Sequence, residues 1–394
     1  MNTTDEIYAQ LRAHLDVMPV AFPRSESGIE ITILKRFYSV DEARVALGLS
    51  ILPETPKRIH RRVLRNGGQL SLDEVTAHLE QLVEKKAINS ETVRRFGKQQ
   101  QMYGKLPFAV GLYEFQVDRL TRGFELEAAA YMDEAFMDDF IHEKPRQMRT
   151  IPINETILPK RNVSRYDNIR QVILSSPGPF ALQNCICRQG RELLGHECRQ
   201  TDLKETCLTL EGVAKQVIAE NRGTRLTQQE TLDYLTQAEA EGLVLQAQNT
   251  RHPDFICSCC SCCCAILSRV RKLPNPGEFL HSNYIVQVNS ELCIGCGICL
   301  ARCPMEALTL EKTTASGPAE SRAKQTAVLA PQRCIGCGVC VHSCPVNALA
   351  MHPRKGPKTP PSSAMEMYVR MLYGRFGPVK ATWLLIKAGL GMRV

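Results

Sequence analysis

The stretch CIGCGICLARCP, from Cys293 to Pro304, recurs as CIGCGVCVHSCP from Cys334 to Pro345. Each copy follows the pattern C-x2-C-x2-C-x3-C-P. Gaps of two residues let successive thiolates converge on one metal group from a tight loop, and the glycines around the second cysteine allow the positive φ that such a loop needs. Zinc needs only paired C-x2-C knuckles, and disulfides need an oxidising compartment. The doubled pattern therefore predicts two polynuclear metal groups.

The doubled pattern resembles that of the two-cluster 4Fe-4S dicluster-domain ferredoxins, in which thiolates hold cubane clusters. This resemblance implies two 4Fe-4S clusters with crossed ligation, in which the fourth cysteine of each run serves the other cluster. It assigns Cys293, Cys296, Cys299 and Cys344 to one cluster, and Cys334, Cys337, Cys340 and Cys303 to the other. We expect extended segments at 284–288 and 327–329, a helical turn after each proline, and an exposed loop from Thr313 to Thr326.

The segment 146–282 contains ten more cysteines at a different spacing. They are Cys185, Cys187, Cys198, Cys207, Cys257, Cys259, Cys260, Cys262, Cys263 and Cys264. Between the two groups, Thr227 and Glu230 predict a capped helix, followed by a strand at 243–246. Ten thiols suffice for one or two additional iron–sulfur clusters. A tetrahedral zinc site, a redox-active dithiol and a cluster with an open iron are the alternatives.

The order of these cysteine groups is itself informative. A CxCR group, a CSCCSCCC group and the doubled run are similar to a family of 4Fe-4S binding proteins of anaerobic bacteria and archaea. That resemblance implies electron transfer but no particular reaction.

Residues 1–145 contain no cysteine and are predicted to be mainly helical. Capping boxes at Ser39 and Ser71 each predict the start of a helix. Residues 88–106 can form a two-stranded wing, and a long helix is expected from Gly111 to Phe140. Several short helices followed by a wing resemble a winged helix. The second capped helix is acidic, however, so we interpret this region as a docking module that does not bind nucleic acid.

The basic character of the chain lies in its tail. The net charge is +8, and residues 351–394 contain eight Lys or Arg and one Glu, which leaves about +1 for the rest. After a Pro-rich linker, one helical stripe contains Met365, Tyr368, Leu372 and Phe376, and a second one is formed by Val379, Trp383, Ile386 and Leu390. A basic amphipathic helix can lie on an anionic bilayer, on a partner subunit or on the body of the protein itself.

Together these features predict an α+β multidomain protein. The expected domains are a winged-helix-like docking domain at 1–145, a cysteine-rich domain at 146–282, a two-cluster ferredoxin domain at 283–352 and a basic tail at 353–394. We see no secretory signal at the N-terminus, and eighteen cysteines indicate metal ligation in a reducing cytoplasm, with the tail able to reach the inner face of the membrane.

Electron transfer between redox partner proteins, as a carrier or as a subunit, is the leading functional hypothesis. A redox-sensing regulator that uses the winged helix, and an oxidoreductase with an open iron in the middle region, are the alternatives. The sequence shows no hydrolase triad, phosphate loop or dinucleotide fingerprint that would indicate a particular catalysis.

Overall fold

The structure is a computed structural model that describes residues 3–95, 97–157, 163–312 and 325–392. Most of the predicted loop from Thr313 to Thr326 lies outside these ranges. The chain forms two compact units, one of residues 1–144 and 368–394 and one of residues 145–367. The predicted mixture of helix and sheet is confirmed. The finer division into four domains stays a prediction.

The first unit is mainly helical. Its helices are α1 (Thr3–Leu15), α2 (Ile29–Phe37), α3 (Val40–Ala46), α4 (Pro56–Arg65), α5 (Leu72–Glu84), α6 (Arg122–Tyr131) and α7 (Met137–His142), with short helical turns at Phe108–Leu112, Glu114–Gln116 and Met132–Phe136. Both predicted capping boxes are present: Ser39 with Glu42 begins α3, and Ser71 with Glu74 begins α5. The aromatic side chains of Phe22, Phe108, Tyr131 and Phe136 pack together in the core.

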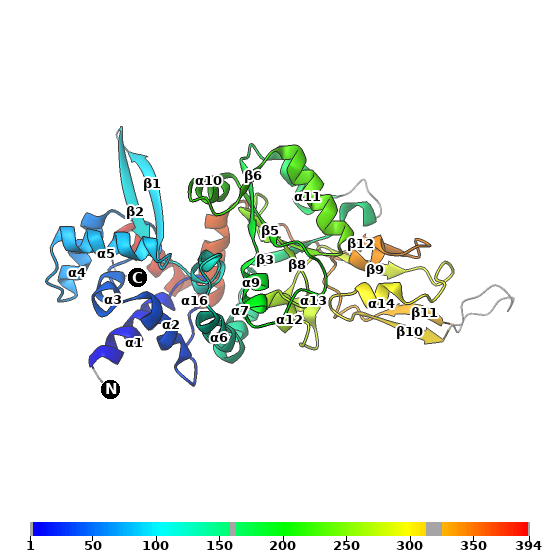
Figure 1. Cartoon of the computed structure of the whole chain (residues 1–394), viewed down its shortest axis with the longest axis horizontal. Coiled ribbons are helices and arrows are strands. Elements are labelled where there is room, and N and C mark those ends of the chain that lie inside the picture. The colour runs from blue at the N-terminus through cyan, green and yellow to red at the C-terminus, as the bar shows by residue number, and fades with distance from the viewer. Residues whose placement is uncertain (1–2, 96, 158–162, 313–324, 393–394) are drawn as a thin grey trace. The chain divides into compact units, whose positions relative to one another are not determined.

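The predicted hairpin is confirmed, but the predicted long helix is wrong. Strands β1 (Asn89–Arg95) and β2 (Lys98–Gly104) pair antiparallel and project from the helices as a long ribbon (Figure 1). Between Gly111 and Phe140 the chain is not one helix, because Asp118 takes a left-handed φ of 62°. Helix α6 begins only at Arg122, after the Thr121 hydroxyl accepts a hydrogen bond from the Phe124 N–H.

The second unit contains a six-stranded sheet in the order β3-β7-β8-β5-β4-β6, with all pairs antiparallel. The strands are β3 (Met148–Ile151), β4 (Phe180–Asn184), β5 (Glu205–Leu210), β6 (Thr224–Leu226), β7 (Val244–Gln248) and β8 (Phe255–Cys259). The helices are α8 (Ile169–Ser175), α9 (Ile186–Leu193), α10 (Glu211–Ala219), α11 (Gln228–Ala240), α12 (Ala265–Val270) and α13 (Pro276–Phe279), with short turns at Asn154–Thr156 and Arg165–Asp167. The predicted capping box of Thr227 and Glu230 begins α11, and β7 is the strand expected at 243–246.

The doubled cysteine run lies in two small ribbons of the same unit. Strand β9 (Tyr284–Val288) pairs with β12 (Leu349–Pro353), and β10 (Leu308–Lys312) pairs with β11 (Gln325–Leu329). Each run contains a short helix, α14 (Ile298–Arg302) or α15 (Val339–His342), and α14 lies beside the two ribbons (Figure 1). The extended segments expected before each run are therefore confirmed as β9 and β11.

The helical turns predicted after each proline are wrong. Both short helices lie before the proline, between the third and fourth cysteines of each run. Glu306 and Asn347, two residues after the prolines, have left-handed φ values of 52° and 51°. A right-handed helix cannot continue through such a residue.

The tail forms α16 (Ala364–Gly389), which bends at Gly377 and Pro378. One face packs on the first unit, where Leu384 and Ala388 contact Val17 and Ile51. The predicted stripe of Val379, Trp383, Ile386 and Leu390 is instead exposed, with Val379 85% exposed. Among the described residues, none of the helices combines the length and the apolar character needed to cross a bilayer.

We predict that Leu79→Ala lowers the free energy of unfolding of the first unit by about 2–5 kcal/mol, because it leaves a cavity in a packed core. Leu79 is fully buried in α5, whereas Leu126 of α6 is 51% exposed, so Leu126→Ala is the matched control. Trp383 is the only tryptophan of the chain and lies in this unit, so its fluorescence during urea titration reports the transition. Equal losses for both variants would contradict the assignment of α5 to the core.

Candidate metal centres

The eight cysteines of the doubled run line two separate cavities. One cavity is lined by Cys293, Cys296, Cys299 and Cys344 together with apolar side chains such as Leu310 and Leu349. The other is lined by Cys303, Cys334, Cys337 and Cys340. Each cavity thus contains three cysteines of one run and the fourth cysteine of the other run.

Glycines let the backbone close around each cavity. Gly295 and Gly336 occupy equivalent positions in the two runs, with φ values of 68° and 69°. A Cβ atom at Gly295 would collide with the carbonyl oxygen of Gln325, and one at Gly336 would collide with that of Tyr284. Glycine is therefore required here by both backbone conformation and space.

Backbone N–H groups point at the sulfurs in the same way in both halves. The Ala307 N–H donates to Cys303 Sγ at 3.2 Å, and the Ala348 N–H donates to Cys344 Sγ at 3.3 Å. The Ala327 N–H donates to Cys293 Sγ at 3.4 Å. Such hydrogen bonds stabilise negative charge on sulfur and tune the potential of an iron–sulfur cluster.

Burial disfavours the negatively charged thiolate form of these cysteines when no metal is bound. It raises the pKa of Cys299, Cys303, Cys337 and Cys340 above the ordinary value, because the thiolate loses its hydration. A bound cation reverses this effect, since coordination favours the thiolate form. Four thiols around an apolar cavity, with N–H donors aimed at sulfur, therefore fit a thiolate-ligated cluster.

The cysteines around the two cavities differ in their exposure. Around the first, Cys296 is exposed and Ile294 is 55% exposed. Around the second, Cys334, Cys337 and Cys340 are all buried. The Ile153 N–H donates to the Cys337 carbonyl at 3.1 Å, so the chain segment after β3 covers the second run.

Comparison with protein families decides the nature of this segment. Residues 292–348 match the family model of the 4Fe-4S dicluster domain. This part of the chain binds two 4Fe-4S clusters. These clusters exchange single electrons, so the dicluster domain is an electron-transfer module. A comparison with curated proteins finds no match to the chain.

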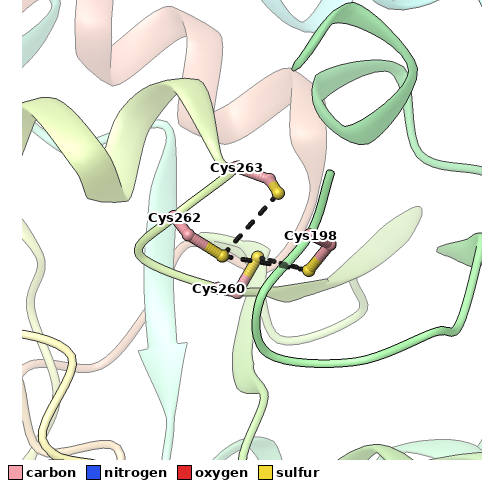
Figure 2. Close-up of side chains that lie close together, drawn as sticks. All are labelled: Cys198, Cys260, Cys262 and Cys263. Atoms are coloured by element: carbon pink, nitrogen blue, oxygen red, sulfur yellow. Dashed lines mark hydrogen bonds between the residues drawn. The ribbon is translucent and has the colours of Figure 1, made fainter. Parts of the chain in front are cut away.

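Outside the dicluster domain, four of the other ten cysteines converge closely. The sulfurs of Cys198, Cys260, Cys262 and Cys263 all lie within 4.8 Å of one another. Figure 2 shows the four side chains close together. Cys198 lies in the loop after α9, and the other three lie in the turn after β8. Cys260 and Cys263 also border the core formed by α8, α11 and the sheet. These four residues are called the four-thiol group below.

The remaining six cysteines are neighbours that perturb one another's ionisation. Cys185 and Cys264 raise the pKa of the Cys187 thiol, Cys257 and Cys264 raise the pKa of Cys259, and Cys257 raises the pKa of Cys207. Cys207 and Cys257 are also direct partners in the β5–β8 pairing. We call Cys185, Cys187, Cys207, Cys257, Cys259 and Cys264 the six-thiol group.

Arg188 is a residue of this region to which the sequence analysis assigned no role. Its guanidinium is buried and donates to the Thr206 hydroxyl, to the Ser258 carbonyl at 3.4 Å and to Cys260 Sγ at 3.7 Å. The only signal in the sequence is its position directly after Cys187, in the CxCR group.

We predict that Gly295→Ala strongly reduces the iron content of the dicluster domain, because the new methyl group collides with the backbone of β11. Gly297→Ala is the matched control in the same loop. Gly297 has a similar φ of 77°, but a Cβ there meets only Leu310 Cδ1 at 3.7 Å. The control should lose only about 1–2 kcal/mol of stability, the cost of a left-handed conformation for alanine, and should keep its clusters. Iron and labile sulfide analysis after anaerobic purification compares the two variants, and equal iron loss would rule out the steric explanation.

Proposed function

We propose that this protein shuttles single electrons between redox partner proteins, either as a ferredoxin-type carrier or as the electron-transfer subunit of an oxidoreductase. The observation that supports the proposal is the pair of cavities in the dicluster domain, each lined by four cysteines. Two neighbouring clusters make a short electron path through one small domain.

The proposal includes crossed ligation within the dicluster domain. The first cluster takes Cys293, Cys296 and Cys299 with Cys344, and the second takes Cys334, Cys337 and Cys340 with Cys303. The membership of the two cavities supports this division. When the clusters are bound, their irons supply the one-electron chemistry, and the residues of the chain hold them and exclude water.

The proposal also assigns iron rather than zinc to the ten cysteines of the middle region. The close approach of the sulfurs in the four-thiol group supports metal binding there. A single zinc ion takes only four thiolates, so one such ion leaves the six-thiol group without a function. Additional clusters beside the dicluster domain would extend the electron path.

The contacts with partners are proposed to involve the first unit and the tail. On the first unit, the winged-helix-like arrangement of α3, α4, α5 and the hairpin serves as a docking module. On the tail, the exposed stripe beside Lys380 and Lys387 of α16 remains available for the bilayer surface or for a partner subunit, the two external contacts that the sequence predicts.

We predict that Cys303→Ser damages the cluster of the second run and leaves that of the first run intact. The reason is that Cys303 lines the second cavity although it belongs to the first run. Cys344→Ser is the mirrored control and should damage the other cluster. EPR spectra of the reduced full-length variants distinguish the two signals. Loss of the first run's cluster in Cys303→Ser would overturn the crossed assignment.

We predict that the anaerobically purified full-length chain contains more iron and labile sulfide than the eight of each in two 4Fe-4S clusters. The excess is expected because ten further thiols lie outside the dicluster domain. Metal analysis by mass spectrometry with sulfide determination measures it. Zinc in place of the excess iron, with sulfide remaining near eight, would contradict the assignment.

We predict that the protein does not bind DNA tightly at about 150 mM salt, near physiological ionic strength. Affinity for DNA depends on free Lys and Arg near the phosphates, whereas α5 exposes Asp73 and Glu80. In the basic helix α4, Arg58 and Arg62 already form ion pairs with Glu54. Titration of random and native promoter duplexes tests this prediction. A sequence-selective complex tighter than micromolar would favour the regulator hypothesis.

A further inference from the structure

We propose that the middle region holds two separate iron–sulfur centres, one in the four-thiol group and one in the six-thiol group, with the buried Arg188 guanidinium as their shared counter-charge. The inference rests on the proposed binding of iron in this region. It goes further because it assigns each cysteine to a centre and gives the centres a common electrostatic partner.

The run CSCCSCCC is divided between the two groups by the local backbone. Cys257 and Cys259 lie in β8, where side chains alternate, so they share one face of the sheet. Ser258 faces the other side, where the Tyr234 hydroxyl donates to its Oγ at 2.8 Å. The chain then turns, and Cys260, Cys262 and Cys263 join Cys198.

The chain returns to the first face at Cys264. This residue is the N-cap of α12, and its Sγ accepts the Leu267 N–H at 3.5 Å. The Cys264 thiol neighbours those of Cys187 and Cys259 in the six-thiol group, and both lower its pKa. Eight consecutive residues thus contribute three cysteines to each group.

The numbers of thiols also favour two centres. Within the four-thiol group, Cys198 Sγ lies 3.7 Å from Cys260 Sγ and 3.8 Å from Cys262 Sγ. Four thiolates complete the ligand set of one cubane cluster. The six-thiol group exceeds that set, and the thiol–thiol contacts of the four-thiol group join only its own members. A single cluster would have to draw on sulfurs that the structure divides between two groups.

The charge of Arg188 connects the two groups. A guanidinium is always protonated in proteins, and leaving it buried without an anion is strongly unfavourable. Among the described residues, no carboxylate forms an ion pair with Arg188. Its neighbours that can become negative are sulfurs: Cys260 Sγ accepts its hydrogen bond at 3.7 Å, and Cys185 of the six-thiol group and Cys198 of the four-thiol group raise its pKa. Two anionic metal centres would neutralise this charge.

Both centres are close to the dicluster domain along the chain and through hydrogen bonds. From Cys264, α12 spans about 9 Å at 1.5 Å per residue, and the Arg271 carbonyl at its end accepts a hydrogen bond from Arg333, the neighbour of Cys334. For the four-thiol group, the connection begins at Cys198. Two residues later, the Gln200 amide donates to the Glu241 carbonyl at 2.7 Å. Arg302, next to Cys303, donates to the adjacent Ala240 carbonyl at 3.1 Å. Each centre therefore has its own short route to the clusters.

Paired substitutions in the full-length protein test the division. Cys198→Ser with Cys262→Ser should remove one centre, and Cys207→Ser with Cys259→Ser should remove the other. Mössbauer and EPR spectra, with iron and sulfide analysis, should show a different signal lost in each double variant, while the two dicluster signals persist as an internal control for folding. If both double variants lose the same signal and all iron above eight, there is one centre and the division is wrong.

The same measurements separate this inference from the proposed function. Zinc without extra sulfide would overturn the iron assignment itself and with it the inference. Iron in a single centre would leave electron transfer through the middle region intact and overturn only the division into two.

Arg188→Gln tests the shared charge. Removal of a buried positive charge should lower the reduction potentials of both middle centres and leave the dicluster potentials unchanged, and Arg188→Lys should restore much of the shift. Arg225→Gln removes one exposed charge from β6 in the same unit and is the matched control. Redox titration followed by EPR compares these three variants with the wild type. A shift in only one centre, or equal shifts in the Arg225 control, would overturn the shared role of Arg188.

Discussion

Each cavity of the dicluster domain depends on a cysteine from the other half of the repeat, and this constraint determines the rest of the domain. The strand before the first run, β9, pairs with the strand after the second run, β12. The strand after the first run, β10, pairs with the strand before the second, β11. These pairings bring Cys344 and Cys303 to the opposite cavities. Neither cavity can be complete unless both halves are folded.

Features that depend on local sequence could be predicted. The capping boxes at Ser39, Ser71 and Thr227 begin helices as expected, since the side-chain and backbone hydrogen bonds involve residues only three apart. The doubled cysteine run identified the dicluster domain for the same reason, because the spacing of its ligands is encoded within each loop.

Features that depend on a single backbone angle or on distant contacts could not be predicted. The left-handed Asp118 divides a segment whose sequence predicts one long helix, and the left-handed Glu306 and Asn347 exclude a helix after each proline. The division of CSCCSCCC between two groups depends on the pleat of β8 and on the turn that follows it. The spacing of the cysteines does not specify which face of the sheet each thiol occupies. It also does not reveal that Arg188 is buried beside them.

The cysteines of the two runs are buried to different degrees, although the domain is nearly symmetric. Ile294 and Ile298 form an apolar surface beside the first cavity, of the small kind through which electron-transfer proteins meet briefly. The second run is contacted by the chain segment that follows β3, whose Ile153 N–H donates to the Cys337 carbonyl. Exposed side chains therefore lie beside the first cluster, whereas buried cysteines of the second run hold the other one. The repeat thus supplies two clusters with similar ligands whose cysteines differ in their contact with solvent.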